Sequence, residues 1–236
     1  WRPVPLGDAQ VLSLRFQTNG TYYTAASMSF MEPWLFGKKP TSFSLSGYYT
    51  RQTNSYYFYQ NPDEYFEVYG VAASLGNRLK WPDNYFVLYH ELSWQAYNLH
   101  DWGYNFLFST GQSNNFSYKV TLARNSTDQQ VFPRQGSDFT FSVQLTPPYS
   151  LFRDPNTNYQ SMTDQERYRW IEYHKWTFKG ALYTKIVGDL VLMARAQFGY
   201  LGSYNKKWGY SPFEGYQVGG DGMSGYNTYG SEIIAL

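Results

Sequence analysis

The chain has 236 residues, of which 21% are aromatic and 16% are charged, and its formal net charge is +1. So small a net charge gives no electrostatic basis for binding DNA or RNA, and we expect no nucleic-acid partner. The absence of cysteine excludes disulfides and thiolate metal sites. No apolar run is long enough for a membrane helix, but a membrane-spanning β-strand needs only about 9–11 residues, half of them apolar.

Long segments alternate between apolar and polar residues along most of the chain. In the clearest one, 190–200, Leu192 and Phe198 fall on one side and Arg195 and Gln197 on the other. Successive side chains of a strand point to opposite faces, so this segment is predicted to be a strand with one apolar and one polar face. The pattern predicts an all-β protein made mostly of one large antiparallel sheet. The expected strands are residues 9–18, 21–32, 41–52, 64–76, 84–98, 115–125, 137–146, 174–187 and 189–201.

The connections between these strands differ in length. Asn19-Gly20 and Gly188-Asp189 are predicted to be tight turns, because Asn and Gly accept positive φ at low cost. Residues 52–63 and 147–173 are polar and longer, and we expect them to be loops at the opposite ends of the strands. Short turns on one rim and long loops on the other are typical of outer-membrane barrels.

The 147–173 loop contains a signal for local helical structure. Thr163 and Glu166 fit a capping box, in which each side chain bonds the backbone N–H of the other residue. We therefore expect one helical turn within this loop.

No combination of residues predicts catalysis. His90, His100 and His174 lack the spacing of metal ligands, and the glycines of 220–225 match G-x-G-x-x-G without the flanking strand and helix that this motif needs. We expect no enzyme activity, no catalytic residue, no metal site and no cofactor.

The two faces of the strands predict two environments. Polar-face residues are expected to point into a solvated barrel lumen, and apolar-face residues are expected to contact lipid. The lumen-facing set is Arg15, Glu91, Lys179, Lys185 and Arg195, and the lipid-facing set is Leu14, Leu88, Phe178, Leu182, Leu192 and Phe198.

Three stretches carry a resemblance to a known family. They are Tyr22–Phe36, which ends in Pro-Trp-Leu-Phe; 125–137, which contains Asn-Ser-Thr, Phe-Pro and Gly-Ser; and 211–230, which begins Ser-Pro-Phe-Glu-Gly-Tyr. In this order they resemble the barrels of BamA-type outer-membrane assembly factors, in the form typical of Bacteroidetes-like members.

The resemblance implies a transmembrane barrel of about sixteen antiparallel strands, preceded by periplasmic POTRA domains. It implies a chain that begins after the first two strands and stops before an Arg-Gly-Tyr signature expected beyond Leu236. Family members fold and insert other β-barrels into the outer membrane without ATP, by offering a strand edge at a lateral seam. The implied partners are outer-membrane lipid, unfolded β-barrel clients, and accessory lipoproteins or other subunits of an assembly complex.

Within this frame, residues 1–204 are expected to form strands and loops, and residues 205–236 are expected to begin a long loop that folds into the lumen. Its aromatic rings gain from burial against an inner wall, and its glycines allow a close approach. The residues assigned to this inward-folding loop are Pro212, Phe213, Glu214, Gly219, Gly220, Gly222, Gly225 and Tyr226.

Alternative interpretations stay open at this point. A passive porin-like channel or a translocation pore would share the alternation and the aromatic content. A soluble carbohydrate-binding β-sandwich would place the same apolar faces inside. The aromatic segment after residue 204 could also serve as an external binding loop.

Overall fold

The computed structural model describes residues 9–35, 41–56, 59–102, 108–153, 161–205, 209, 211, 213–217 and 233–234. Nine strands form one sheet in the order β1 to β9. Every neighbouring pair is antiparallel. The strands are β1 (Val11–Asn19), β2 (Tyr23–Glu32), β3 (Thr41–Tyr56), β4 (Tyr59–Arg78), β5 (Phe86–His100), β6 (Gly111–Asn125), β7 (Gly136–Leu145), β8 (His174–Val187) and β9 (Leu190–Gly202).

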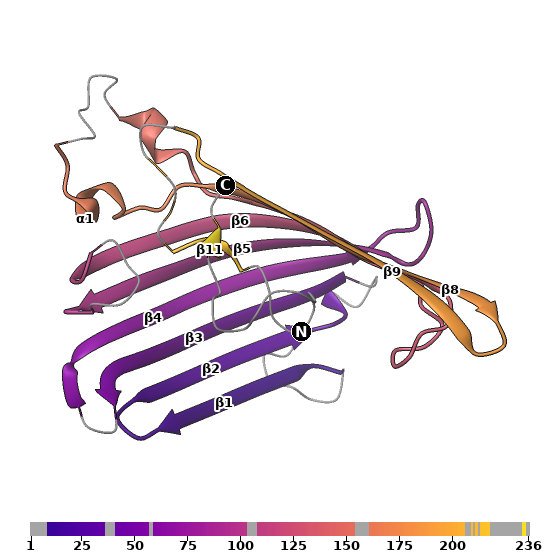
Figure 1. Ribbon diagram of the computed structural model, residues 1–236, viewed down its shortest axis with the longest axis horizontal. Coiled ribbons are helices and arrows are strands. Elements are labelled where there is room, and N and C mark those ends of the chain that lie inside the picture. Colours follow the sequence, from indigo (N-terminus) through magenta and orange to yellow (C-terminus); the bar gives the residue numbers. More distant parts are fainter. Residues whose placement is uncertain are drawn as a thin grey trace.

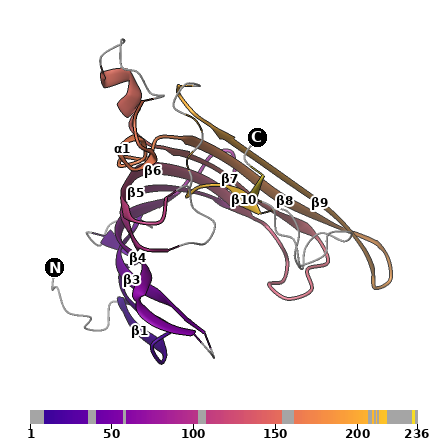
Figure 2. The same ribbon diagram turned by 60° about the vertical axis from the view of Figure 1, so that its left-hand side comes forward.

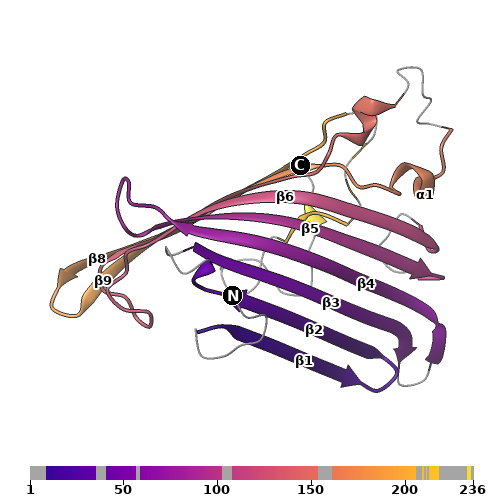
Figure 3. The same cartoon turned by 180° about the vertical axis from the view of Figure 1, so that it is seen from behind.

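The sheet is a single curved and twisted layer. Figures 1 and 3 show β1 to β6 side by side, and Figure 2 shows the curvature and the continuation through β7 to β9. No second sheet of comparable size packs on it within the described residues, where the other sheet is the pair β10 (Tyr216–Gln217) and β11 (Ile233–Ile234). The β-sandwich interpretation is therefore wrong, because a sandwich buries its apolar faces between two sheets.

All nine predicted strands are confirmed, and one predicted loop is wrong. Residues 52–63 were expected to be a loop, yet β3 continues to Tyr56 and β4 starts at Tyr59. Thr53 pairs with Tyr65, and the register then shifts so that Asn54 pairs with Asn61. This register shift lets the polar residues pair within the sheet. It also interrupts the strict apolar–polar alternation by which strands are recognised in a sequence.

The predicted division of the rims is partly wrong. The Asn19-Gly20 and Gly188-Asp189 turns do form, with Gly20 at φ 59° and Gly188 at φ 57°. Connections of an up-and-down sheet alternate between its two ends, so the β1–β2 turn lies on the same rim as the long β7–β8 connection. Only the β8–β9 turn lies at the opposite rim, as predicted.

The β7–β8 connection is the long loop that the sequence predicts. It contains the 3-10 helix η2 (Tyr149–Phe152) and the short helix α1 (Asp164–Arg167). Thr163 caps α1, and the reciprocal contact from Glu166 completes the predicted capping box. Among the described residues, no helix is long and apolar enough to cross a membrane.

The pairing register sorts the side chains into two faces. One face, here called the polar face, carries Arg15, Glu91, Lys179, Lys185 and Arg195. The other, the apolar face, carries Leu14, Leu88, Phe178, Leu182, Leu192 and Phe198. Leu14 is 72% exposed and Phe198 is 62% exposed, so the apolar face is uncovered by protein at both ends of the sheet. A face of this kind is stable where hydrocarbon replaces water.

Candidate functional site: a segment anchored on the polar face

The chain returns to its own sheet after β9. Residues 213–217 lie against the polar face of strands β5 to β9, where Phe213 and Tyr216 pack on a buried cluster. This cluster consists of Ile171, Tyr173 and Leu201, each at most 1% exposed. Ile171 and Tyr173 come from the end of the β7–β8 loop, and Leu201 comes from β9. The end of the β7–β8 loop and the segment after β9 thus pack together on the polar face.

An aromatic stack fixes the start of the segment. The ring of Phe213 lies 4.5 Å from the ring of Tyr97, centroid to centroid, with 13° between the ring planes. Phe108 meets Phe213 edge-on at 6.0 Å. Stacked and edge-to-face rings contribute about 0.5–1.5 kcal/mol beyond the burial of their area. Phe213 therefore supplies an apolar anchor that joins the buried cluster on this face.

An ion pair holds the next residue. Lys175 Nζ lies 2.9 Å from Glu214 Oε2 and also donates to the Gly215 carbonyl oxygen at 3.1 Å. The Lys175 and Glu214 side chains are 20% and 14% exposed. A pair so far withdrawn from water is screened little by salt, and removing one partner leaves the other charge poorly solvated. The backbone of the segment and its carboxylate are thus fixed by one cation.

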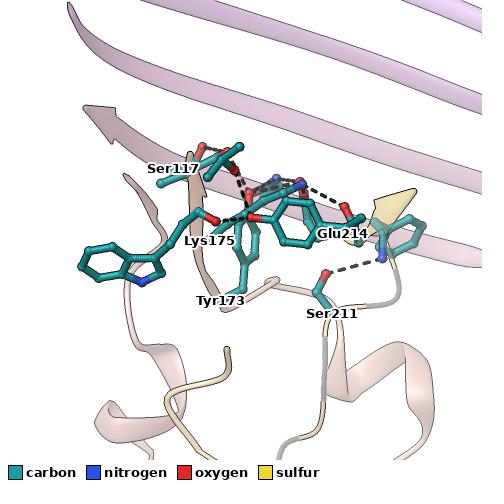
Figure 4. A network of polar contacts seen from close by, with 12 residues as sticks. Ser117, Tyr173, Lys175, Ser211 and Glu214 are labelled. Atoms are coloured by element: carbon teal, nitrogen blue, oxygen red, sulfur yellow. Dashed lines mark hydrogen bonds and ion pairs between the residues drawn. The ribbon is translucent and has the colours of Figure 1, made fainter. Parts of the chain in front are cut away.

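The other oxygen of Glu214 receives neutral donors. Tyr173 Oη donates to Glu214 Oε1 at 3.1 Å, and Asn115 Nδ2 lies 3.3 Å from the same oxygen. Burial, and then the nearby carboxylate, raises the pKa of Tyr173, so this phenol stays protonated and can donate. Figure 4 shows Glu214 facing Tyr173 and Lys175 across this network.

The network continues along the wall through Gln144. Gln144 Nε2 donates to Tyr173 Oη at 2.8 Å and lies 2.9 Å from Ser117 Oγ. Ser117 and Asn115 are each 1% exposed although they are polar. Buried polar groups are tolerated when they are hydrogen-bonded. Asn115 Nδ2 and Ser117 Oγ have partners on β5, on β7, in the β7–β8 loop and in the segment 213–217, whereas Asn115 Oδ1 has none among the described residues.

Tyr216 docks on a strand position that lacks a side chain. A Cβ added to Gly199 would lie 2.6 Å from the Tyr216 ring, so the ring occupies the space above this glycine. The hydroxyl of Tyr216 donates to the Trp176 carbonyl and shares a 2.9 Å contact with the Thr177 hydroxyl. The Lys175 ammonium lies 5.0 Å from the ring centroid, a cation–π distance. Gly199 is therefore a receptor position for this ring.

The β7–β8 loop is fastened where it delivers Tyr173. Tyr173 N donates to Thr146 Oγ1 at 2.7 Å, and Thr146 N donates to the Tyr173 carbonyl at 3.1 Å. The carboxylate of Glu172, only 1% exposed, accepts from both the backbone N–H and the hydroxyl of Ser150 at 2.7 Å. These contacts hold Tyr173 in place without involving Glu214.

The predicted site residues are described in part. Phe213 and Glu214 lie on the polar face, in contact with the wall, as the inward-folding assignment requires of them. The remaining members of that set lie outside the described residues: Pro212, Gly219, Gly220, Gly222, Gly225 and Tyr226. The five charged residues share the face that carries Glu214, and the assignment of this face to a lumen stays a prediction.

Sequence reasoning missed the wall residues that receive the segment. Tyr173 precedes its strand and therefore lies outside the alternating pattern. Lys175 and Lys179 both fall on the polar face by alternation, yet Lys179 makes no comparable contact among the described residues. The one sequence feature that could have indicated a covered wall is the pair of polar residues Asn115 and Ser117 on the polar face of their strand. Nothing in the periodicity distinguishes a covered polar face from an open one.

The comparisons with known proteins agree with this geometry. The Omp85 superfamily domain matches residues 5–231, nearly the whole chain. The chain belongs to the Omp85 superfamily. It is accordingly part of a β-barrel of the bacterial outer membrane, and the open sheet is a section of that barrel. The predicted total of about sixteen strands stays a prediction.

A solved structure shares the fold. It is described as BamA from Haemophilus ducreyi lacking POTRA domains 1-3, and it matches this chain with a TM-score of 0.65 at 20% identity. The match covers 92% of this chain and 40% of that one, so the chain spans well under half of the BamA structure. A search of curated proteins found no match.

Proposed function

We propose that this chain is a section of an outer-membrane assembly factor that folds β-barrel proteins and inserts them into the outer membrane. The observation that carries the proposal is the anchoring of Phe213–Gln217 on the polar face of an Omp85 barrel. A passive porin-like channel conducts through an open lumen and has no need for a wall that holds a returning segment through an ion pair, a ring stack and a glycine receptor position.

The proposed mechanism is physical and involves no bond chemistry. A client strand in hydrocarbon has unpaired N–H and C=O groups, each of which costs several kcal/mol. A barrel that opens at a lateral seam offers its own strand edge, and the client pairs with it by β-augmentation. We place this seam outside the wall of β5 to β9, which the anchored segment stiffens. We propose no catalytic residue, no metal and no cofactor.

The partners that follow are unfolded β-barrel clients, outer-membrane lipid and other subunits of an assembly complex, among them accessory lipoproteins. The match to BamA supports these partners only through the shared fold. An Omp85 barrel that translocates proteins would share the same wall, and we keep translocation as the second candidate for that reason.

The test is depletion of the full-length protein in its bacterium, followed by the assembly of several β-barrel proteins. Folded barrels resist SDS until heated, so their unheated gel mobility reports assembly. Assembly should fail on depletion, return with the wild-type gene, and return only partly with Lys175→Met. Lys185→Met removes a lysine from the same face without touching Glu214 and is the matched control. Normal barrel assembly together with lost solute uptake would indicate a channel instead. Failed export of a secreted protein with intact barrels would indicate translocation.

A further inference from the structure

The polar face of β6 to β9 carries an excess of positive charge. The pairing register places Lys119, Lys175, Lys179, Lys185 and Arg195 on it, and Asp138 is the single carboxylate that these four strands contribute to the same face. The formal net charge of the entire chain is only +1. The cations are thus concentrated on one wall and balanced elsewhere, and a curved wall with low-dielectric surroundings focuses their field.

Among the described residues, three of these lysines, Lys119, Lys179 and Lys185, have no carboxylate partner. Lys175 is paired with Glu214, but neither Lys119 nor Lys179 lies within 4.0 Å of a carboxylate oxygen among the described residues. Lys119 stands directly across from Glu91 in the β5–β6 ladder, yet their charged ends do not meet. Two unneutralised ammonium groups that flank one area of wall repel each other, and this repulsion favours an anion between them.

A polar hollow of about 430 Å³ lies between these lysines. Besides Lys119, Lys175 and Lys179, its lining includes the hydroxyls of Thr121, Thr140 and Ser142. Thr140 pairs with Lys179 across the β7–β8 ladder, and Thr121 pairs with Ser142 across the β6–β7 ladder. No described residue forms a hydrogen bond with these three hydroxyls, whereas the polar groups of the neighbouring Glu214 network are bonded to one another. The hollow therefore combines free donors with free positive charge.

We propose that this hollow is an anion-binding site for a phosphate group. A phosphate offers several strong acceptor oxygens, which suits two ammonium groups and three hydroxyls arranged around it. Chloride has a single centre and would leave most of these donors unused. The phosphate can be free in solution or part of a lipid headgroup, since both present the same oxygens. The site lies beside the Glu214 anchor and shares Lys175 with it, but it does not depend on the insertion role.

The test uses the full-length protein, purified in a neutral detergent free of phosphate and kept in 150 mM chloride. Inorganic phosphate is titrated by isothermal calorimetry. We expect saturable binding that weakens by about tenfold or more in Lys119→Gln/Lys179→Gln, because hydrogen bonds to charged groups are stronger than those between neutral groups. Lys185→Gln makes the same charge change on the same face outside the hollow and should leave the affinity nearly unchanged. Lys179→Gln alone, at an exposed position, serves if the double variant does not fold.

Native mass spectrometry distinguishes the two sources of phosphate. A phospholipid or lipopolysaccharide fragment that stays bound to the wild type and is lost from the double variant identifies a headgroup as the ligand. Binding of free phosphate alone identifies the soluble ion. The proposal is overturned if phosphate does not bind saturably, or if Lys185→Gln weakens it as much as the double variant does. The second result would mean a diffuse positive wall with no defined site.

Discussion

The two ends of the sheet share one sequence pattern but have different surroundings. In β1, every residue is exposed on both faces of the strand. In β6, the polar-face residues Ser113, Asn115 and Ser117 are at most 1% exposed, although they are as hydrophilic as the β1 residues Ser13 and Gln17. Alternation with a period of two therefore determines which way a side chain points and leaves open what it meets there.

The difference arises from segments distant in sequence. Lys175 and Glu214 are 39 positions apart, and Asn115 and Glu214 are 99 positions apart. Among the described residues these contacts cover the polar face of β5 to β9, whereas β1 at the other end of the sheet is exposed throughout. Local stability follows buried contacts. We therefore expect the covered wall of β5 to β9 to be stiffer than the exposed β1 end of the sheet.

The largest expected effect tests what the two ends of the sheet have in common, the apolar face that we predict contacts lipid. Leu182→Arg in β8 and Leu14→Arg in β1 should each destabilise the barrel by about 2–4 kcal/mol near the bilayer midplane, because hydrocarbon does not solvate a guanidinium. Tyr183→Arg places the same group on the polar face and should cost much less. The measurement is denaturant unfolding of the full-length protein in liposomes. Equal costs for Leu182→Arg and Tyr183→Arg would contradict the assignment of the faces, and a larger cost for Tyr183→Arg would reverse it.

The sequence predicted the shared features of the two ends well. The alternation in 190–200 located β9 to within one residue at either end, and the faces of Arg195 and Leu192 follow from it. The Thr163 capping box was recognised because its chemistry is local. In contrast, the pairing beyond Thr53 depends on a bulge, and the covering of Asn115 depends on Glu214. The alternating pattern of β3 does not predict the irregular pairing, and the pattern of β6 does not predict that Glu214 covers Asn115.

The next effect should separate the covered wall of β5 to β9 from the exposed β1 end. Lys175→Met removes the cation that holds Glu214 and should release the segment 213–217 from the wall, at a cost of about 1–3 kcal/mol. Hydrogen exchange should become faster in this segment and around Tyr173. Lys179→Met on the same wall and Arg15→Met in β1 should leave the exchange of the segment unchanged. If all three variants behave alike, the ion pair does not anchor the segment.

A smaller effect is expected at the glycine receptor position. In Gly199→Ala the new methyl group would come within 2.6 Å of the Tyr216 ring, so the ring must move and lose its contacts with Trp176 and Thr177. We expect a loss of about 1 kcal/mol in the docking of the segment, the amount of one hydrogen bond. Gly47→Ala in β3 is the control, because its methyl group meets no atom closer than 3.8 Å. Tyr216 fluorescence or ring NMR signals that stay unchanged in Gly199→Ala would contradict the docking.

The smallest effect concerns the β6–β7 turn at the rim away from the anchored segment. Asp128 Oδ1 accepts from the backbone N–H groups of Arg134 at 2.9 Å and Gln135 at 3.2 Å, and these donors lower the pKa of Asp128. The pKa of Asp128 in the folded protein therefore lies below the unfolded value of about 3.9. The ionised carboxylate stabilises the turn at pH values above the unfolded pKa. This contribution is lost as the pH falls through the folded pKa.

Acidification below about pH 4 should therefore loosen this turn. The readout is hydrogen exchange at the Arg134 and Gln135 amides as a function of pH, corrected for the intrinsic pH dependence of exchange. Asp128→Asn keeps an acceptor oxygen but cannot titrate, so its amides should show no loosening over the same pH range. A wild-type turn with the same corrected pH profile as Asp128→Asn would show that the charge of Asp128 does not hold the turn.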